Sequence, residues 1–369
     1  MKKVISKSGL LLIAGITMIT GTATAQKKAE TDAALAYRSI ETAMQNQDME
    51  AAKKATLKAK GFIDQAAAHA ETEKSPKTLY YKGEIYGTIH FLRQLNDQAF
   101  NDATPADALD QAIKAYNTAF TSSDKFDSEI TTSIGNGKMQ LAMAANALFD
   151  AKKFKEAGDM YETTAKLSSA INEIDTAAIY NTALCAANAE DWERAAANYR
   201  KCAELNYKPE TIYSTTASAY INAKKNEEAL NFLKEAIKRT PNDKFLHFAL
   251  GTIAMDLNDD QLVIDNLKKA CEIDTKYADA YYNLGGYFLG KGEDLRQKAA
   301  DLPTSEKKQA EEMLNKSLEY YKLSTDALEQ YIVLEPNNPD VLKSLYKMFR
   351  ALKNTEKEAK YKKMMEEAK

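Results

Sequence analysis

Few residues of this chain combine the type and spacing that catalysis or metal binding requires. The three histidines, His69, His90 and His247, have no partner at metal-ligand spacing, and neither His-Glu-x-x-His nor Cys-x-x-Cys occurs. No serine or cysteine nucleophile motif is present. Carboxylates are abundant, but acid–base catalysis needs two groups held in one cleft, and no pattern singles out such a pair. We therefore predict no catalytic, metal-binding or cofactor-binding residues.

One short segment partly matches a phosphate-binding loop, with Gly285 followed by Gly290 and Lys291. The motif needs Ser or Thr at the next position to bind magnesium, and here that residue is Gly292. It also needs a preceding strand, whereas this segment has a helical pattern. Nucleotide binding is therefore disfavoured.

The chain has three cysteines, Cys185, Cys202 and Cys271. An odd number is not typical of a disulfide framework, even in an oxidising compartment. Buried apolar thiols are the favoured state. A bridge between Cys185 and Cys202 stays open as the alternative.

The elements that position these residues follow a 34-residue period, with units that begin at Thr176, Glu210 and Lys244. Counted from these residues, small side chains recur at positions 8, 20 and 27 and larger ones at position 24. Position 20, for example, is Ala195, Ala229 and Val263. The pattern predicts two short helices in each unit that approach closely. Low glycine and proline content and the absence of strand-like runs favour an all-helical chain.

A 34-residue period with this order of small and large residues resembles the tetratricopeptide repeat (TPR) family. The resemblance implies an all-α fold, a right-handed α-solenoid in which antiparallel helix pairs stack into a superhelix. Irregular units on both sides of the central three bring the expected number to about eight pairs. In such a solenoid each unit contacts its neighbours, so a long chain needs no single large core.

We divide the chain into five segments. They are a signal peptide at 1–25, degenerate TPR-like helical pairs at 26–137, a regular TPR array at 138–277, a TPR unit with a helical insertion at 278–338, and a capping helix pair at 339–369. The insertion, residues 291–316, is strongly charged. We expect it to form one long helix that projects beyond the solenoid and breaks near Pro303, as a structural elaboration and not a second contact surface.

Residues 1–25 have the layout of a secretory signal peptide. Basic residues precede an apolar run from Gly9 to Thr20, and Ala23-Thr24-Ala25 forms a small-x-small cleavage site. The run is too short to span a bilayer, which disfavours the alternative of an uncleaved anchor. No later segment has the composition of a membrane span. We predict an exported protein, periplasmic in the first place, with the cell surface or the medium as alternatives.

The balance of charge argues against nucleic acid as a partner. The chain has 50 basic and 53 acidic residues, a net charge of −3, and its basic residues form no sustained stripe. Nucleic-acid binding depends on the neutralisation of phosphates by Lys and Arg.

In the TPR family the concave groove is lined largely by positions 2, 5, 9, 12 and 13 of the first helix of each pair, helix A. Chaperone-binding members hold a partner's terminal carboxylate with Lys at position 5 and Asn at position 9, and here no Lys occupies position 5 in the regular units. The groove instead carries aromatic and apolar residues, namely Tyr180, Leu184, Phe245, Phe248 and Tyr282. We predict that they bind an extended or helical apolar segment of a protein partner. The alternative is that they only pack between neighbouring helices.

The predicted function is that of an exported, non-catalytic scaffold for protein–protein interaction. Two alternatives stay open because fold does not dictate function. One is an envelope factor that binds glycan or peptidoglycan through the aromatic side chains. The other is an enzyme with an unrecognised site in the N-terminal region, 26–137.

Overall fold

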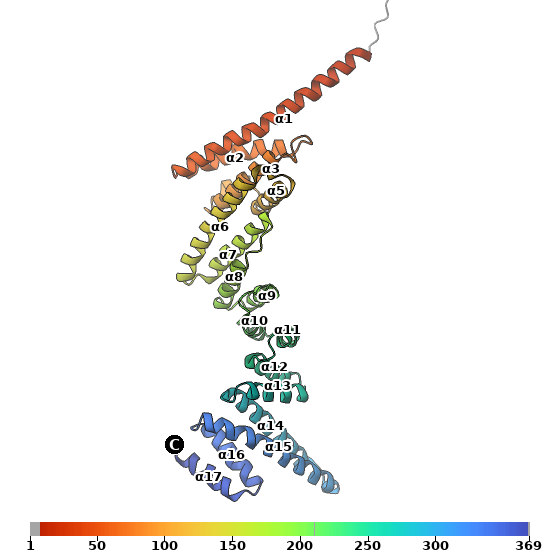
Figure 1. Cartoon of the computed structure of the whole chain (residues 1–369), viewed down its shortest axis with the longest axis vertical. Helices are drawn as coiled ribbons and strands as arrows, with labels where there is room; N and C mark the ends of the chain where they lie inside the picture. Colours follow the sequence, from red (N-terminus) through yellow and green to blue (C-terminus); the bar gives the residue numbers. More distant parts are fainter. Residues whose placement is uncertain (1–7, 210, 368–369) are drawn as a thin grey trace, which may run out of the picture. The chain divides into compact units, whose positions relative to one another are not determined.

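The computed structural model describes the backbone of residues 8–209 and 211–367, and side chains from Lys27 onward. Within these residues the chain forms seventeen α-helices and three short 3-10 turns, and no strand (Figure 1). It divides into two compact units, Met1–Glu190 and Asp191–Lys369. The predicted signal peptide falls largely on residues whose side chains lie outside this description, so it stays a prediction. None of the described helices is long and apolar enough to cross a membrane.

The first unit is built from consecutive helices that pack in pairs. Its elements are α1 (Ser8–Gln45), α2 (Met49–Ala67), α3 (Pro76–Arg93), α4 (Gln98–Ala103), α5 (Ala108–Ser122), η1 (Asp124–Phe126), α6 (Asp127–Asp150), α7 (Phe154–Ser168), η2 (Ser169–Ile171) and α8 (Thr176–Asn188). Helix α1 packs on α2, α3 on α5, and α6 on α7, and α8 packs on α7. The short α4 lies in the connection between α3 and α5.

The second unit continues the same arrangement. Its elements are α9 (Trp192–Glu204), α10 (Ile212–Asn222), α11 (Asn226–Arg239), α12 (Lys244–Asp256), α13 (Asp260–Ile273), α14 (Ala278–Asp301), η3 (Thr304–Glu306), α15 (Lys307–Leu334), α16 (Pro339–Ala351) and α17 (Thr355–Glu367). Each helix packs on the next along the chain. Because α9, α11 and α13 begin at residues 192, 226 and 260, the 34-residue period of the sequence is also the period of the helices. The predicted all-α solenoid class is confirmed.

The small residues of the pattern have a steric cause, which is seen in three helix pairs of the structure. Two of these pairs lie in the second unit. A Cβ atom built on Gly251 of α12 would lie 2.8 Å from Cγ of Leu267 on α13, because the two helices meet closely at this point. Gly285 of α14 faces Leu328 of α15 in the same way, with a Cβ-to-Cγ distance of 2.5 Å. A small residue on the first helix thus receives a large residue from the second.

This small-to-large contact also occurs in the N-terminal region, whose sequence is the most degenerate. Gly83 of α3 lies against Tyr116 of α5, and a Cβ atom on Gly83 would lie 2.4 Å from the tyrosine ring. The α3–α5 pair therefore follows the same packing rule, although α4 lengthens its connection.

The turns between paired helices place a residue in the left-handed backbone region. Glu190, Lys224 and Asn258 have φ angles of 58°, 56° and 55°, and they are one repeat apart in sequence. Gln47, Lys152 and Lys353 occupy the equivalent turns after α1, α6 and α16. Among the described residues no glycine takes a positive φ, so all of these turns carry a side chain in a conformation that glycine adopts more easily.

The insertion differs from the single projecting helix expected from the sequence. Helix α14 ends at Asp301, the chain turns through η3, and α15 returns alongside α14 from Lys307. Pro303 causes the break, because it lacks an N–H and cannot continue the helix. The two arms hold together through Tyr321, whose hydroxyl donates to Glu293 at 2.6 Å. The predicted break is right, but the insertion is a hairpin extension of two antiparallel helices.

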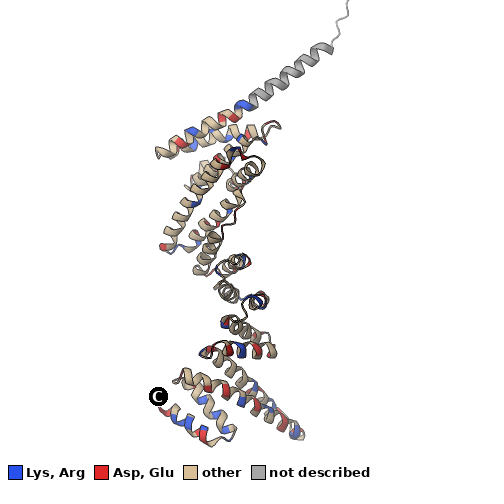
Figure 2. Cartoon of the chain, in the orientation of Figure 1, with Lys and Arg blue, Asp and Glu red and all other residues tan. Residues whose placement is uncertain are grey.

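Charged residues of both signs are scattered over the helices of each unit (Figure 2). Many of them form pairs between neighbouring elements. Lys244 at the start of α12 pairs with Asp274 at the end of α13, and Lys291 of α14 pairs with Asp260 of α13 at 2.6 Å. Such exposed pairs each contribute about 0–1 kcal/mol, so they adjust the packing of helices more than they drive it.

Candidate partner-binding groove

The second unit has a hollow of about 310 Å³ among four helices. Its lining includes Met255 from α12, Tyr282, Gly286 and Tyr287 from α14, Leu328 from α15, and Asp340 and Val341 from α16. Numbered from the first residue of each helix A, Met255 is at position 12, Tyr282 at 5, Gly286 at 9 and Asp340 at 2. The hollow thus lies where the sequence pattern places the groove.

Helix geometry explains how α14 opens this hollow. Tyr282 and Gly286 are one helical turn apart, so they share a face of α14. A Cβ atom added to Gly286 would meet nothing within 4 Å, whereas the adjacent Gly285 is pressed against Leu328 on the helix face that packs on α15. Tyr282 is 46% exposed, and its ring contacts Tyr331 of α15 with the centroids 5.3 Å apart. The ring therefore stands at the edge of the hollow with a large part of its surface open.

Asp340 supplies the only charge among the described residues that line the hollow. The chain enters α16 through Asn338, whose side chain accepts a hydrogen bond from the backbone N–H of Val341 at 3.2 Å. Pro339 occupies the first helical position, which proline favours because that residue needs no N–H partner. Asp340 follows in the first turn, where the helix dipole stabilises a negative charge.

The structure places the five predicted groove residues in different surroundings. Tyr282 lines the hollow. Phe245, 53% exposed, and Phe248 instead lie on α12 against Tyr277, with ring centroids 5.6 and 5.1 Å apart. Tyr180 and Leu184 lie on α8 in the first unit and are partly buried. Binding by these five residues stays a prediction, and the inter-helix packing alternative fits Phe248 best.

Lys244 of α12 lies close to the rings of Phe245 and Tyr277. Its ammonium nitrogen lies 4.9 Å from the centre of the Tyr277 ring and 5.1 Å from that of Phe245. Burial raises the pKa of Tyr277 to about 12, with smaller contributions from nearby carboxylates. This group therefore combines an exposed phenyl ring with a cation that is already paired with Asp274.

Sequence reasoning missed Asp340, Met255 and Tyr287. Asp340 looks like an ordinary helix-start residue beside Pro339, and only the placement of α16 against α15 reveals that it borders a hollow. Met255 was detectable, because it holds position 12 of its unit, which is one of the groove positions. Nothing in the sequence marks Tyr287.

The N-terminal region holds one feature that could support the enzyme alternative. Glu84 on α3 is the only carboxylate among the buried residues of the described chain, with 8% exposed. Its two oxygens accept hydrogen bonds from Tyr37 of α1 and Ser133 of α6, each at 2.5 Å. Burial, together with the charge of Glu84, raises the pKa of Tyr37. Both oxygens accept hydrogen bonds, so this cluster joins α1, α3 and α6.

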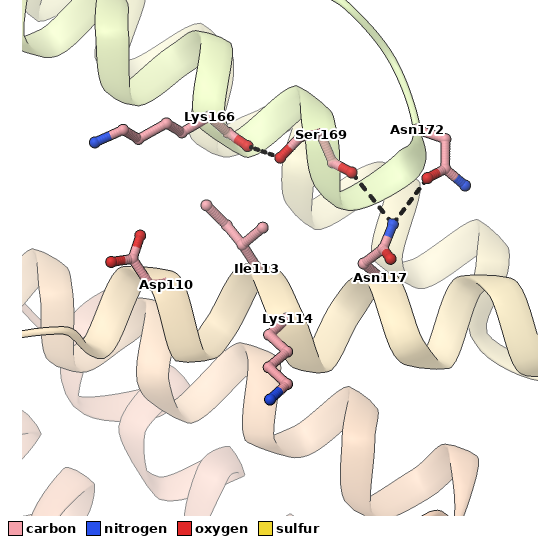
Figure 3. Close-up of a pocket in the computed structure, with 7 residues that line it drawn as sticks. All are labelled: Asp110, Ile113, Lys114, Asn117, Lys166, Ser169 and Asn172. Carbon is pink, nitrogen blue, oxygen red and sulfur yellow. Dashed lines mark hydrogen bonds between the residues drawn. The ribbon is translucent and has the colours of Figure 1, made fainter.

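A second hollow lies in the first unit between α5, α7 and η2 (Figure 3). Its volume is about 440 Å³. Asn117 of α5 donates to the backbone carbonyl of Ser169 at 3.2 Å and to Oδ1 of Asn172 at 2.9 Å, which joins α5 to the end of α7. Figure 3 shows Lys114 and Lys166 extending in different directions. The polar residues of this lining that hydrogen-bond to one another therefore join α5 to the end of α7.

The remaining side chains whose type could support catalysis or metal binding have structural roles. His247 is buried, with Nδ1 2.9 Å from Oδ1 of Asn266 and Nε2 3.0 Å from the backbone oxygen of Pro241. In the described part of the chain, no group of three or more His, Cys, Asp or Glu residues is arranged to hold a metal ion. Cys185, Cys202 and Cys271 are all buried, and burial raises the pKa of Cys271 to about 11. Their burial agrees with the apolar thiols that the sequence favours, and a Cys185–Cys202 bridge stays the alternative.

Paired helices with a 34-residue period and a groove on the helix-A side define the class of helical-repeat proteins. Residues 128–244 match the family model described as Iml2/Tetratricopeptide repeat protein 39, a segment that runs from α6 to the start of α12. This match supports the tetratricopeptide repeat family, which the sequence pattern predicted, over that segment of the chain. No curated protein matches the chain.

Several solved structures show partial likeness to the chain. A TPR repeats protein from Bacteroides fragilis NCTC 9343 is 25% identical over 58% of this chain and 97% of its own, with a TM-score of 0.38. MamA from Desulfovibrio magneticus RS-1 is 19% identical over 51% and 97%, with a TM-score of 0.35. YrrB, described as a TPR protein with an unusual peptide-binding site, is 19% identical over 54% and 97%, with a TM-score of 0.35. With scores this low, the fold assignment depends on the chain's own helices and on the family model.

Proposed function

We propose that this protein is an exported, non-catalytic scaffold that binds a segment of a partner protein on the helix-A side of its repeats. One observation carries the proposal. Helix-A residues of three successive pairs, from α12, α14 and α16, border a single hollow, and an exposed aromatic side chain stands at its edge. Partly exposed aromatic side chains at pockets are frequent energetic centres of protein interfaces.

Capture of partners from envelope extracts by the purified chain, after chemical crosslinking, tests the binding role. We expect Tyr282→Ser to weaken capture by roughly tenfold or more, since loss of an interface tyrosine often costs over 1 kcal/mol. Phe91→Ser is the matched control, because Phe91 is also exposed, at 45%, and lies on α3 in the other unit. Retained capture by a helical Tyr282→Ser protein would remove the hollow from the proposal. Tyr180→Ser and Phe248→Ser examine the rest of the predicted groove in the same assay.

Export is supported by the sequence pattern of residues 1–25 alone. Cell fractionation combined with N-terminal sequencing of the native protein tests it. We expect the mature chain in the periplasmic or surface fraction, beginning at Gln26. A cytoplasmic protein that retains Lys2 and Lys3 would contradict export and leave the binding proposal to the capture experiment.

A further inference from the structure

We propose that the hollow between α12, α14, α15 and α16 receives a basic side chain of the partner segment, with arginine preferred to lysine. This inference rests on the proposed function, since it names the chemistry of the partner at the same site. Three properties of the hollow support it: an unpaired carboxylate, an open aromatic ring and an apolar floor.

The carboxylate of Asp340 is the one charged group among the described residues that line the hollow. Asp340 is exposed and takes part in none of the ion pairs formed by the described residues. Two carboxylates on neighbouring helices are paired instead: Asp260 with Lys291 and Glu329 with Lys357, each at 2.6 Å. An acceptor without a cation at the mouth of a hollow favours a positively charged occupant.

Tyr282 adds a second attraction for a cation. Its ring is partly open, and the contact with Tyr331 fixes its position. A guanidinium can stack on a tyrosine face and also donate paired hydrogen bonds to a carboxylate, which an ammonium cannot do with the same geometry. The combination of Tyr282 and Asp340 therefore favours arginine.

The floor of the hollow suits the aliphatic part of the same side chain. Leu328 and Val341 are buried beneath it, and Met255 borders it. Arginine and lysine place their methylene groups on apolar surface while the charged end stays polar. A volume of about 310 Å³ lies at the lower end of the range for small-ligand pockets, which fits one long side chain better than a whole cofactor.

The same features argue against the opposite occupant. A partner's terminal carboxylate would face Asp340 with a like charge, and no lysine or arginine is among the described lining residues to offset the repulsion. The hollow therefore has the reverse polarity of a carboxylate-binding groove.

Fluorescence anisotropy with four labelled decapeptides tests the inference on the full mature chain. The peptides share an alternating leucine framework and carry Arg, Lys, Gln or Glu at the same central position. We expect the Arg peptide to bind about tenfold more tightly than the Gln peptide, with Lys between them and Glu weakest. The Arg preference should shrink at high salt, because the pair is partly exposed.

Substitutions at Asp340 give the decisive comparison. Asp340→Asn should bring Arg and Gln peptides to within about twofold of each other, and Asp340→Lys should make the Glu peptide the tightest. Asp326→Asn removes the same charge from an exposed position on α15 that does not line the hollow, and it should keep the Arg preference. Circular dichroism confirms that each variant is folded.

Equal binding of Arg and Gln peptides to the wild-type chain, or an Arg preference that survives Asp340→Asn, would overturn the inference. So would failure of the Arg peptide to bind. Each of these results leaves the proposed function to the Tyr282→Ser capture experiment, so the two ideas fail separately.

Discussion

Two adjacent glycines in α14 have different surroundings, because one packs against α15 and the other borders the hollow. Gly285 faces α15, where a side chain would overlap Leu328, while Gly286 faces the hollow and has open space around it. The contact between α14 and α15 requires a residue without a side chain at Gly285. Gly286 has no such role, and glycine weakens helix interiors.

Replacement of each glycine by alanine should therefore have opposite effects on stability. We expect Gly285→Ala to lower the free energy of unfolding by about 1–3 kcal/mol through overpacking. Gly286→Ala should raise it by about 0.5–1 kcal/mol through better helix propensity. Urea unfolding followed by circular dichroism measures both. A stabilised Gly285→Ala protein would contradict the close contact between α14 and α15.

His247 supports a second prediction at the residue scale. Its replacement by leucine keeps a similar volume but removes the ring nitrogens that lie beside Oδ1 of Asn266 and the carbonyl of Pro241. We expect a loss of about 1–3 kcal/mol, because each unsatisfied buried polar group carries a desolvation cost. The double variant His247→Leu, Asn266→Leu should recover part of the loss. Equal stability of His247→Leu and the wild type would show that these hydrogen bonds contribute little.

Single residues were predictable from sequence where the repeat assigns them a role. Tyr282 lines the hollow from its helix-A position, and Gly285, which resembles part of a phosphate-binding loop, is accounted for by Leu328. Phe248 shows where prediction falls short, because a helix-A position can face either a groove or a neighbouring ring such as Tyr277. Asp340 acquires its surroundings from three helices, and no local pattern encodes that combination.

At the scale of elements, the two arms of the hairpin extension, α14 and α15, are held together by residues near its base. Gly292 lies against Tyr321, and Arg296 lies over the Tyr321 ring, with its guanidinium carbon 5.8 Å from the ring centre. Beyond Ala299, the residues of the tip up to Glu312 are almost all exposed. The base therefore holds the two arms and the tip does not.

Removal of the tip should accordingly have little effect on the array. We expect replacement of residues 300–312 by a short turn to shift the free energy of unfolding by less than about 1 kcal/mol, as is usual for surface changes. Tyr321→Phe in the intact chain should cost about as much or more, because it removes the hydrogen bond to Glu293. Thermal unfolding compares the two proteins. A large loss on tip removal would indicate that the tip contributes to folding.

The helices of the regular array were predictable because small and large residues alternate with a fixed period. The insertion was not, because its charged sequence is compatible with one long helix or with two antiparallel arms. The choice depends on Tyr321 and Gly292, which lie far apart in sequence and meet only when α15 folds back. The N-terminal pairs were recognisable at Gly83 and Tyr116, although α4 obscures the period.

At the scale of the whole molecule, the burial of tyrosines makes the stability of the folded state depend on pH in the alkaline range. Burial is the main cause of the raised pKa values of eleven tyrosines among the described residues, namely Tyr37, Tyr80, Tyr81, Tyr86, Tyr116, Tyr161, Tyr277, Tyr281, Tyr287, Tyr321 and Tyr361. A tyrosine whose folded pKa exceeds the ordinary value of 10.0 stabilises the folded state fully below pH 10. That contribution is lost as the pH rises through the folded values.

We therefore expect alkaline unfolding in which tyrosinate absorbance and helicity change together. The transition should lie above pH 10, because these side chains resist ionisation while they are buried. Parallel absorbance and circular dichroism titrations measure it. Gradual ionisation of all tyrosines near pH 10 with full helicity would contradict their burial.

The side-chain-bearing left-handed turns between paired helices have a consequence for how far this chain can be stabilised. Residues other than glycine incur a steric penalty in that conformation, which is smaller for asparagine. Lys152, Lys224 and Lys353 close separate helix pairs, so exchanges to glycine at these sites should combine additively. Each exchange should raise the free energy of unfolding by about 0.5–1 kcal/mol, and Asn258→Gly by less. Substitutions in the connections between paired helices can thus raise the thermal stability of this repeat protein without any change to the groove.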